Sequence, residues 1–190
     1  QQRKEIGNLQ RDEKALARLI VRLERIIAAQ RAKAPRAPAK GASRAPGTER
    51  EAAPEAFPSG AFAALKGRLR LPVRGTVSNR YGGKRQEGST WKGLFIRAAQ
   101  GSEVKAIAGG RVVFSDWMRG FGNLLIVDHG DSYLSIYGYN DAVLTQVGDE
   151  VRGGDPIATA GNSGGNPESG LYFELRHQGQ PVDPQKWIGQ

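Results

Sequence analysis

Residues 101–112 have the sequence GSEVKAIAGGRV, in which two short runs of alternating apolar and polar side chains flank the pair Gly109-Gly110. Alternation with a period of two is typical of a half-buried β-strand, and paired glycines are typical of a sharp turn. The stretch therefore predicts two short strands, 103–106 and 110–115, with a tight turn between them.

The same pattern continues in both directions from this stretch. Short alternating runs are separated by glycine-rich segments between residues 75 and 176, and the chain has 26 glycines in 190 residues. This composition predicts a mainly β, glycine-rich sandwich with sharp turns. The other predicted strands are 75–78, 93–97, 123–127, 133–137, 156–160 and 171–176.

Residues 147–158, VGDEVRGGDPIA, further limit the folds that fit the sequence. The run resembles the V-x-x-G-x-x-V-x-x-G-x-x-I-A pattern of barrel-sandwich hybrid folds. Lipoyl and biotinyl carriers share this pattern and present a lysine in a tight turn, but the run here contains no lysine. The run therefore indicates a fold and says nothing of function.

The N-terminal segment has the periodicity of one long helix over residues 3–30. Its apolar positions recur every seven residues in two series, with one polar interruption at Glu13. An a/d seam of this kind predicts a coiled coil. The two series are Ile6, Glu13, Ile20 and Ile27, and Leu9, Leu16 and Leu23.

Three parts are predicted along the chain. Residues 1–30 form the coiled-coil helix, 31–56 form an Ala/Pro-rich linker too poor in large apolar groups to fold alone, and 57–190 form the β domain. The candidate for a short regulatory helix is 48–65. Because the sequence begins inside a helical pattern, we expect the coiled coil to be truncated and any export signal to lie upstream.

Charge is distributed unevenly along the chain. The net charge is +9, and residues 1–50 contain 13 Lys and Arg against 5 Asp and Glu, whereas residues 51–190 contain 15 against 14. A nearly neutral β domain argues against a nucleic-acid-binding protein. The basic arm is interpreted as a solvated helix and linker, or alternatively as a surface attracted to an anionic partner. Cysteine is absent, which excludes disulfides and thiolate metal sites.

Three short motifs carry a family resemblance. They read WKGLF at 91–95, YGY at 137–139 and GLYFE at 170–174, and they are accompanied by the glycine pattern of 101–112 and by PVDP at 181–184. Residues 71–187 thus resemble the LytM-type zinc peptidase domain of peptidase family M23. Members of that family carry His-x-Gly-x-Asp, Tyr-x-His and His-Leu-His-Phe-Glu at the three motifs.

The resemblance also shows which side chains differ from those of the enzymes. Trp91, Phe95 and Tyr172 align with the three zinc ligands, and Tyr139 and Gly170 align with the two histidines that assist catalysis. Indole, phenyl and neutral phenol groups do not replace imidazole or carboxylate as zinc ligands. We therefore predict a degenerate domain with no metal, no cofactor and no catalytic residue.

The two histidines of the chain do not restore such a site. His129 lies in a strand-to-turn sequence, where the family resemblance implies a structural role. His177 lies in an Arg-His-Gln-Gly turn, where it is predicted to face solvent. Because they lack nearby carboxylate partners in the motif frame, they do not predict a zinc site.

Strand alternation predicts what replaces the zinc site. Side chains two positions apart share a face, so the positions that would have held zinc form an aromatic floor with a charged rim. Buried aromatic groups next to arginine are typical of protein-binding hot spots, although Trp91 and Phe95 could instead fill the vacated cavity as core. The predicted partner-binding groove comprises Lys92, Phe95, Phe121, Leu124, Tyr172 and Arg176, with Trp91, Tyr139 and Glu174 as further candidates.

The resemblance extends to the degenerate LytM divisome factors of Gram-negative bacteria. It implies an exported activator of periplasmic zinc N-acetylmuramoyl-L-alanine amidases, which acts at the division septum and binds the transporter complex FtsEX through an intact coiled coil. It also implies that a helix contributed by the linker covers the groove. Two other functions remain open, a passive peptidoglycan-binding module and a LytM zinc endopeptidase with displaced ligands.

Overall fold

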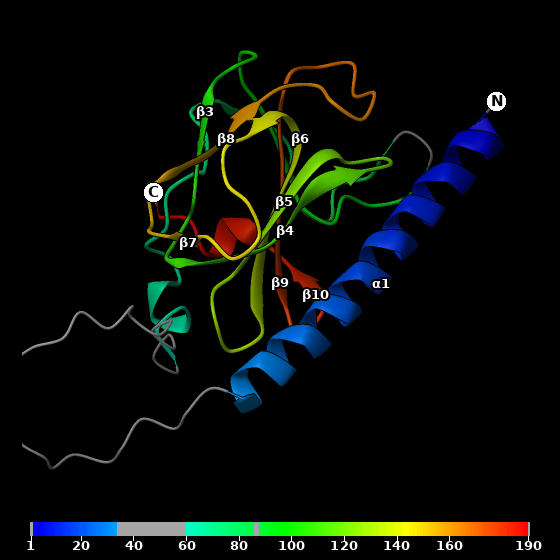
Figure 1. Ribbon diagram of the computed structural model, residues 1–190. Helices are drawn as coiled ribbons and strands as arrows, with labels where there is room; N and C mark the ends of the chain where they lie inside the picture. The colour runs from blue at the N-terminus through cyan, green and yellow to red at the C-terminus, as the bar shows by residue number, and fades with distance from the viewer. Residues whose placement is uncertain (1, 34–59, 86–87, 190) are drawn as a thin grey trace, which may run out of the picture.

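The computed structural model describes residues 2–33, 60–85 and 88–189, which form one open β-sheet and a long helix that crosses it (Figure 1). The elements are α1 (Gln2–Lys33), η1 (Ala63–Leu65), β1 (Thr76–Asn79), β2 (Leu94–Arg97), β3 (Glu103–Lys105), β4 (Gly110–Met118), β5 (Gly122–Asp128), β6 (Tyr133–Val143), β7 (Glu150–Val151), β8 (Pro156–Ala160), β9 (Gly170–His177), β10 (Gln180–Val182) and η2 (Pro184–Lys186).

The sheet has ten antiparallel strands with β9 and β6 near its centre. The main order is β1-β2-β9-β6-β5-β4-β7, with β10 added on β9, and β8 joining β6 to β3. Its two ends, β1 and β7, do not pair with each other in the described part of the chain, so the sheet is not closed. This order brings the three motifs of the sequence together, because the first motif leads into β2 and the other two lie on β9 and β6, which come next to it in the sheet.

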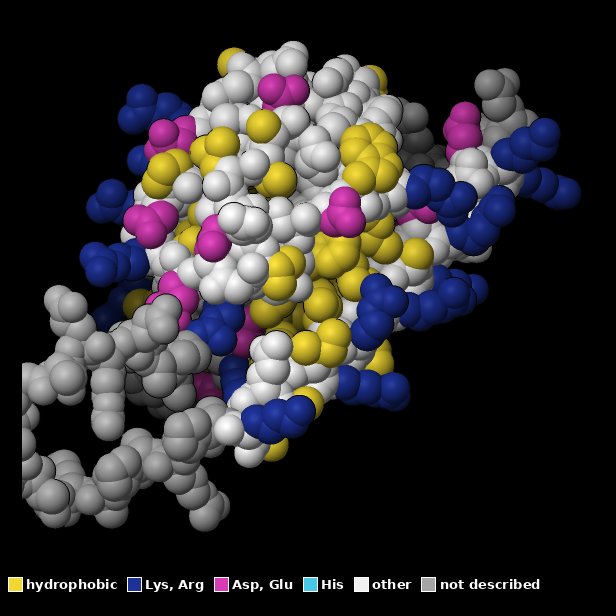
Figure 2. Space-filling view, viewed as in Figure 1, with side chains coloured by type: hydrophobic (Ala, Val, Ile, Leu, Met, Phe, Trp, Pro, Cys, Tyr) yellow, Lys and Arg dark blue, Asp and Glu magenta, His cyan; other side chains and the backbone are white. Residues whose placement is uncertain are grey.

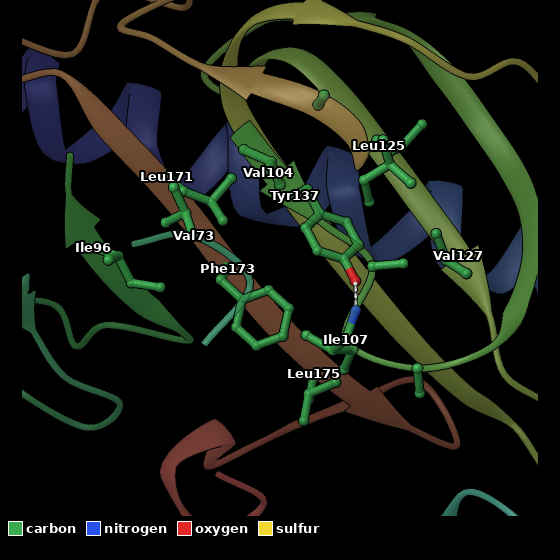
Figure 3. Close-up of a cluster of buried hydrophobic side chains, with 14 of the residues drawn as sticks. Val73, Ile96, Val104, Ile107, Leu125, Val127, Tyr137, Leu171, Phe173 and Leu175 are labelled. Carbon is green, nitrogen blue, oxygen red and sulfur yellow. Dashed lines mark hydrogen bonds between the residues drawn. The ribbon is translucent and has the colours of Figure 1, made fainter. Parts of the chain in front are cut away.

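One face of the sheet encloses the main hydrophobic core. Alternate residues of β9, namely Leu171, Phe173 and Leu175, point into this core (Figure 3). Tyr137 of β6 lies beside them, and its hydroxyl accepts a hydrogen bond of 3.1 Å from the backbone N–H of Ile107. No residue of α1 belongs to this cluster, so the β domain has a core of its own.

The opposite face of the sheet is covered by α1, and we call it the α1 face. Figure 2 shows apolar side chains gathered between the helix and the sheet. The buried helix residues are Leu16, Leu19, Ile20 and Leu23. They pack on Phe95, Phe121, Leu124, Ile126, Leu134, Ile136, Tyr139 and Tyr172. Burial of these apolar side chains explains why a helix with so many charged residues packs on the β domain.

The predicted strands are all confirmed. β4 and β6 extend several residues beyond their predicted ends, and β7 and β10 are additional. Antiparallel pairing continues along β4 and β6 past the point where the apolar alternation ends, because β5 and β8 lie beside these extensions. The mainly β fold class with an N-terminal helix is therefore confirmed.

The predicted helix is also present, but the partner of its apolar seam differs. Leu16, Ile20 and Leu23 of the expected coiled-coil seam contact the chain's own sheet. Most of the predicted linker, 31–56, and residues 48–59 of the candidate regulatory helix lie outside the described residues. Within the part of the chain that the structure describes, no helix is both long and apolar enough to cross a bilayer.

Candidate functional site

The vacated motif positions meet on the α1 face. Phe95 of β2 is paired with Tyr172 of β9, and Gly138 of β6 is paired with the same tyrosine. The ring of Tyr172 lies 5.5 Å from that of Tyr139, 5.8 Å from that of Phe121 and 6.2 Å from that of Trp91, measured between ring centres. The structure thus brings the aromatic groove residues together around Tyr172.

Tyr139 reaches this face because of a β-bulge in β6. Between the pairs Asn123–Asn140 and Leu125–Tyr137, β6 contains two residues where β5 contains one. Tyr139 has a φ of +64°, a left-handed conformation that is uncommon for residues other than glycine. Its backbone N–H donates a hydrogen bond of 2.7 Å to the carbonyl of Phe121. The bulge redirects the side chain to the same face as Tyr172.

Phe95 and Gly170 fit each other in volume. A Cβ atom placed on Gly170 would lie 2.8 Å from the Cζ atom of Phe95 and 2.3 Å from the carbonyl oxygen of Ile96. The phenyl ring therefore occupies space that a side chain at 170 would need. Phe95 thus leaves no room at position 170 for the histidine that the family motif has there.

Glu174 and Arg176 form a buried ion pair below the aromatic groups. Their side chains are 2% and 6% exposed, and Nε of Arg176 lies 2.8 Å from a carboxylate oxygen of Glu174. The other carboxylate oxygen accepts a hydrogen bond from the hydroxyl of Tyr172. Burial first, and then the charge of Glu174, raise the pKa of Tyr172 well above its ordinary value. Tyr172 is therefore a neutral hydrogen-bond donor.

The edge of the site contains Trp91 and Lys92, which are both half-buried. The guanidinium of Arg85 lies 3.9 Å from the ring centre of Trp91, within the range of a cation–π contact. The ammonium of Lys92 lies 3.4 Å from the hydroxyl of Thr90. Sequence reasoning did not identify Arg85, because the motifs place no residue of the 84–90 loop near the groove.

The helix α1 covers the site and is held by charge pairs as well as by apolar contacts. Nε of Arg119 donates a hydrogen bond of 2.9 Å to Oδ1 of Asp12, and Nη2 of Arg119 lies 2.8 Å from the same oxygen. Gly120 makes this approach feasible, because a Cβ atom there would lie 2.5 Å from an oxygen of Asp12. At the other end of the helix, Arg31 lies 3.4 Å from Asp128.

A cavity remains between the N-terminal half of α1 and the aromatic groups. It has a volume of about 570 Å³ and is lined by Leu9, Asp12 and Glu13 from the helix and by Phe121, Tyr139 and Tyr172 from the domain. The groove is therefore covered but incompletely filled. A larger cavity of about 1160 Å³, lined mainly by residues 65–75 and 102–109, lies elsewhere and includes none of the predicted groove residues.

The site does not fit the zinc ion that the family motif would hold. The ligand positions do converge, but they present an indole, a phenyl ring and a phenol that donates to Glu174. None of these groups is a zinc ligand in its neutral form. Among residues 2–33, 60–85 and 88–189, no cluster of three or more His, Cys, Asp or Glu side chains is placed to hold a metal.

His129 lies on the other side of the sheet. It is buried, its Nδ1 lies 2.7 Å from the carbonyl oxygen of Gly109, and its Nε2 lies 2.6 Å from the hydroxyl of Ser135. Burial lowers the pKa of His129 to about 4. His177 is half-buried and stacks on Tyr133, with 4.0 Å between ring centres.

Solved structures of known proteins share this fold. A zinc-containing peptidase from Vibrio cholerae aligns with a TM-score of 0.58 and 24% identity over 64% of this chain and 39% of that chain. The catalytic domain of the prophage-encoded M23 protein EnpA from Enterococcus faecalis aligns with a TM-score of 0.56 and 24% identity, over 64% of this chain and 96% of that one. At these identities the likeness concerns the fold alone.

Relatives of known name are more similar in sequence. The murein hydrolase activator EnvC of Escherichia coli K12 is 49% identical over 131 residues, which are 69% of this chain and 31% of that protein. The murein hydrolase activator NlpD of the same strain is 39% identical over 122 residues, which are 64% and 31%. The chain thus spans about a third of the length of these two relatives.

The family model that matches is peptidase family M23, over residues 89–184. This range is half of the chain and includes all three motif segments, from Trp91 just before β2 to Glu174 on β9. The matched region, the open antiparallel sheet and the identity to EnvC and NlpD agree with one another, and the chain belongs to peptidase family M23.

Proposed function

We propose that this chain is a non-catalytic activator of N-acetylmuramoyl-L-alanine amidases, which binds the amidase through the aromatic groove of the α1 face. The observation that carries the proposal is the convergence of Phe95, Tyr139 and Tyr172 at positions where the family motif has ligands or catalytic histidines. The names of EnvC and NlpD as murein hydrolase activators support it.

Absence of catalysis follows from the chemistry of the side chains. A zinc hydrolase needs at least three nitrogen, oxygen or sulfur ligands and an open coordination position for water. Trp91, Phe95 and Tyr172 supply no such set, and Gly170 leaves the position of one assisting histidine without a side chain. The chain would therefore act by binding.

The mechanism of activation is exchange of helices on one face. The groove already binds an amphipathic helix, α1, through Leu16, Ile20 and their neighbours, so its shape and polarity suit helix-in-groove recognition. An amidase segment of similar character would take this place when α1 leaves. Capture then shifts the amidase toward its active state by no more than the difference in binding free energy.

In this mechanism α1 inhibits the activator. The pair Asp12–Arg119 and the buried leucines hold the helix over the groove, and a partner must displace both. Residues 48–65 were the sequence-based candidate for this inhibitory helix, and our proposal gives that role to α1. We place the reaction in the periplasm at the division septum, and docking on FtsEX through an intact coiled coil remains a prediction.

The test is an activation assay with a cognate amidase and dye-labelled peptidoglycan sacculi. Ile20→Asp puts a charge at a fully buried contact of α1, so it should release the helix and raise dye release above that of the parent chain. Adding Tyr172→Ala or Lys92→Ala to Ile20→Asp should reduce activation. The matched control adds Trp117→Ala, which removes an aromatic side chain that is 56% exposed.

The outcomes separate the three functions. Each of Tyr172→Ala, Lys92→Ala and Trp117→Ala is compared in the Ile20→Asp background. If all three double variants activate the amidase equally and circular dichroism shows that they are folded, the groove assignment is contradicted. Sedimentation with sacculi and no effect on amidases would indicate a passive peptidoglycan-binding module. Stoichiometric zinc together with chelator-sensitive cleavage of peptide cross-bridges would indicate an endopeptidase.

A further inference from the structure

The side of α1 that faces away from the sheet is lined by basic residues. With about 100° of rotation per residue, they fall within an arc of about 120° centred on Arg18. The acidic residues of α1, namely Glu5, Asp12, Glu13 and Glu24, all fall outside this arc. Six of the exposed basic residues of α1, which we call the basic stripe, are Lys4, Arg11, Lys14, Arg18, Arg22 and Arg25. Figure 2 shows dark-blue Lys and Arg side chains along the side of the helix that is turned away from the sheet.

The basic stripe weakens the helix that carries it. Lys14 and Arg18 are four residues apart, as are Arg18 and Arg22, and like charges at this spacing repel each other across one turn. In the described part of the chain, neither Lys14 nor these two arginines form an ion pair that would offset the repulsion. A face that served only solubility would mix both signs. The one-signed stripe fits an anionic partner.

The shape of the stripe favours a flat partner. It runs along the helix axis from Lys4 to Arg25, a length of about 32 Å, so one planar surface can reach every member. A coiled-coil partner would need an apolar seam, and that seam is already buried on the sheet. Val21 and Ile26 are 48% and 46% exposed and flank the stripe on its two sides. Apolar side chains beside arginines are typical of helices that lie at a membrane interface.

We propose that the basic stripe of α1 is a docking surface for an anionic phospholipid bilayer. The arginines and lysines contact lipid phosphates, and Val21 and Ile26 enter the headgroup region. Because the stripe lies opposite Ile20 and Leu23, α1 stays on the sheet in the bound state and separates the β domain from the bilayer. This docking does not depend on the proposed function, since it uses the opposite side of the helix from the groove.

The experiment measures binding of the whole chain to vesicles by co-sedimentation. Vesicles of phosphatidylcholine with phosphatidylglycerol should bind the chain, and vesicles of phosphatidylcholine alone should not. One basic side chain near an anionic bilayer strengthens binding about five-fold, so Arg18→Gln, Arg22→Gln and Arg25→Gln together should weaken it about 100-fold. Added salt should weaken binding of the parent chain.

A matched control removes the same charge from elsewhere. Arg68→Gln, Arg97→Gln and Arg152→Gln together replace three exposed arginines of the β domain. This variant should keep most of the affinity of the parent chain. Neither triple variant should unfold below the parent temperature, because the replaced side chains are exposed.

Orientation provides a second readout. The chain has no cysteine, so Val21→Cys can be labelled with a polarity-sensitive dye at one position. Its emission should shift to the blue when anionic vesicles are added, and the same dye on Glu103→Cys, an exposed position on β3, should show no shift.

Three results would overturn the proposal. One is equal binding to both kinds of vesicle, and another is equal loss of binding in the two triple variants. The third is binding to polyglutamate without binding to phosphatidylglycerol vesicles, which would identify the stripe as a surface for an acidic protein.

Discussion

Phe95 and Gly170 illustrate how the site is determined residue by residue. The phenyl ring takes the space next to residue 170, and the glycine removes the side chain that would clash with it. Tyr172 is kept neutral by burial and donates to Glu174, which also binds Arg176. The side chains that replace the ligands contact one another or the groups beside them. Restoring a single histidine would therefore not restore a metal site.

At the scale of single residues, the sequence predicted the face of some side chains but not of others. Strand alternation correctly placed Tyr172, Glu174 and Arg176 on one face, because β9 is regular throughout that segment. Alternation alone would have put Tyr139 on the other face, and the bulge that redirects it depends on pairing with β5. Register shifts arise between strands, so a single strand's sequence does not reveal them.

His129 makes stability depend on pH. Burial lowers its pKa to about 4, from an ordinary value of 6.5. The unfolded chain therefore takes up a proton first as the pH falls, and the native state loses stability between pH 6.5 and pH 4. A difference of this size corresponds to about 3 kcal/mol. Urea unfolding at neutral pH and at about pH 4 should show this loss.

The control for His129 is His129→Gln, which keeps a neutral polar side chain at the position. Its stability should change less between the two pH values than that of the parent chain. Asp128 has a pKa raised by burial, so it acts in the opposite direction, and both proteins share this effect. An equal pH dependence in the two proteins would show that His129 is not the group that titrates.

At the scale of elements, the predicted and observed structures differ mainly in the partner of α1. A heptad seam and a stripe that faces a sheet both repeat every three to four residues. The spacing of Leu16, Ile20 and Leu23 therefore predicts a helix with one apolar side but does not reveal what that side contacts. The short strands β7 and β10 were missed because β7 has only two residues and β10 contains Pro181, and a proline weakens the prediction of a strand.

Docking of α1 can be tested by hydrogen exchange. Leu16 and Ile20 are 1% and 0% exposed, and truncating such side chains to alanine costs about 2–5 kcal/mol each. Leu16→Ala with Ile20→Ala should therefore increase amide exchange along α1, because an undocked helix frays. Amide exchange of the residues of β6 and β9 that face the main hydrophobic core should change little.

The matched control truncates Val21 and Ile26, which are on the same helix but about half exposed. Val21→Ala with Ile26→Ala removes similar side chains without changing the contact with the sheet. Its exchange should equal that of the parent chain. A similar increase in both double variants would mean that the buried contacts of Leu16 and Ile20 are not what protects α1.

The whole molecule has two apolar clusters that share one sheet. The larger cluster contains Tyr137 and Phe173 and receives nothing from α1, whereas the smaller one is completed by Leu16 and Ile20. Loss of the helix would therefore remove the cover of one face without removing the core of the domain. Because only the smaller cluster depends on α1, the α1 face can be exposed while the β domain stays folded.

This independence predicts that residues 60–190 fold without α1. The shortened chain should unfold cooperatively, and it should expose Phe95, Phe121 and Tyr172 together as one apolar patch. Patches of this kind bind hydrophobic dyes and promote association. The fluorescence of the dye ANS with the shortened chain should therefore exceed that with the whole chain, and a peptide of residues 2–33 added in excess should reverse the increase.

The control is the same peptide with Leu16→Asp and Ile20→Asp, which should have no effect because its row of apolar side chains is interrupted. If both peptides acted alike, the covering of the α1 face would not depend on these buried contacts.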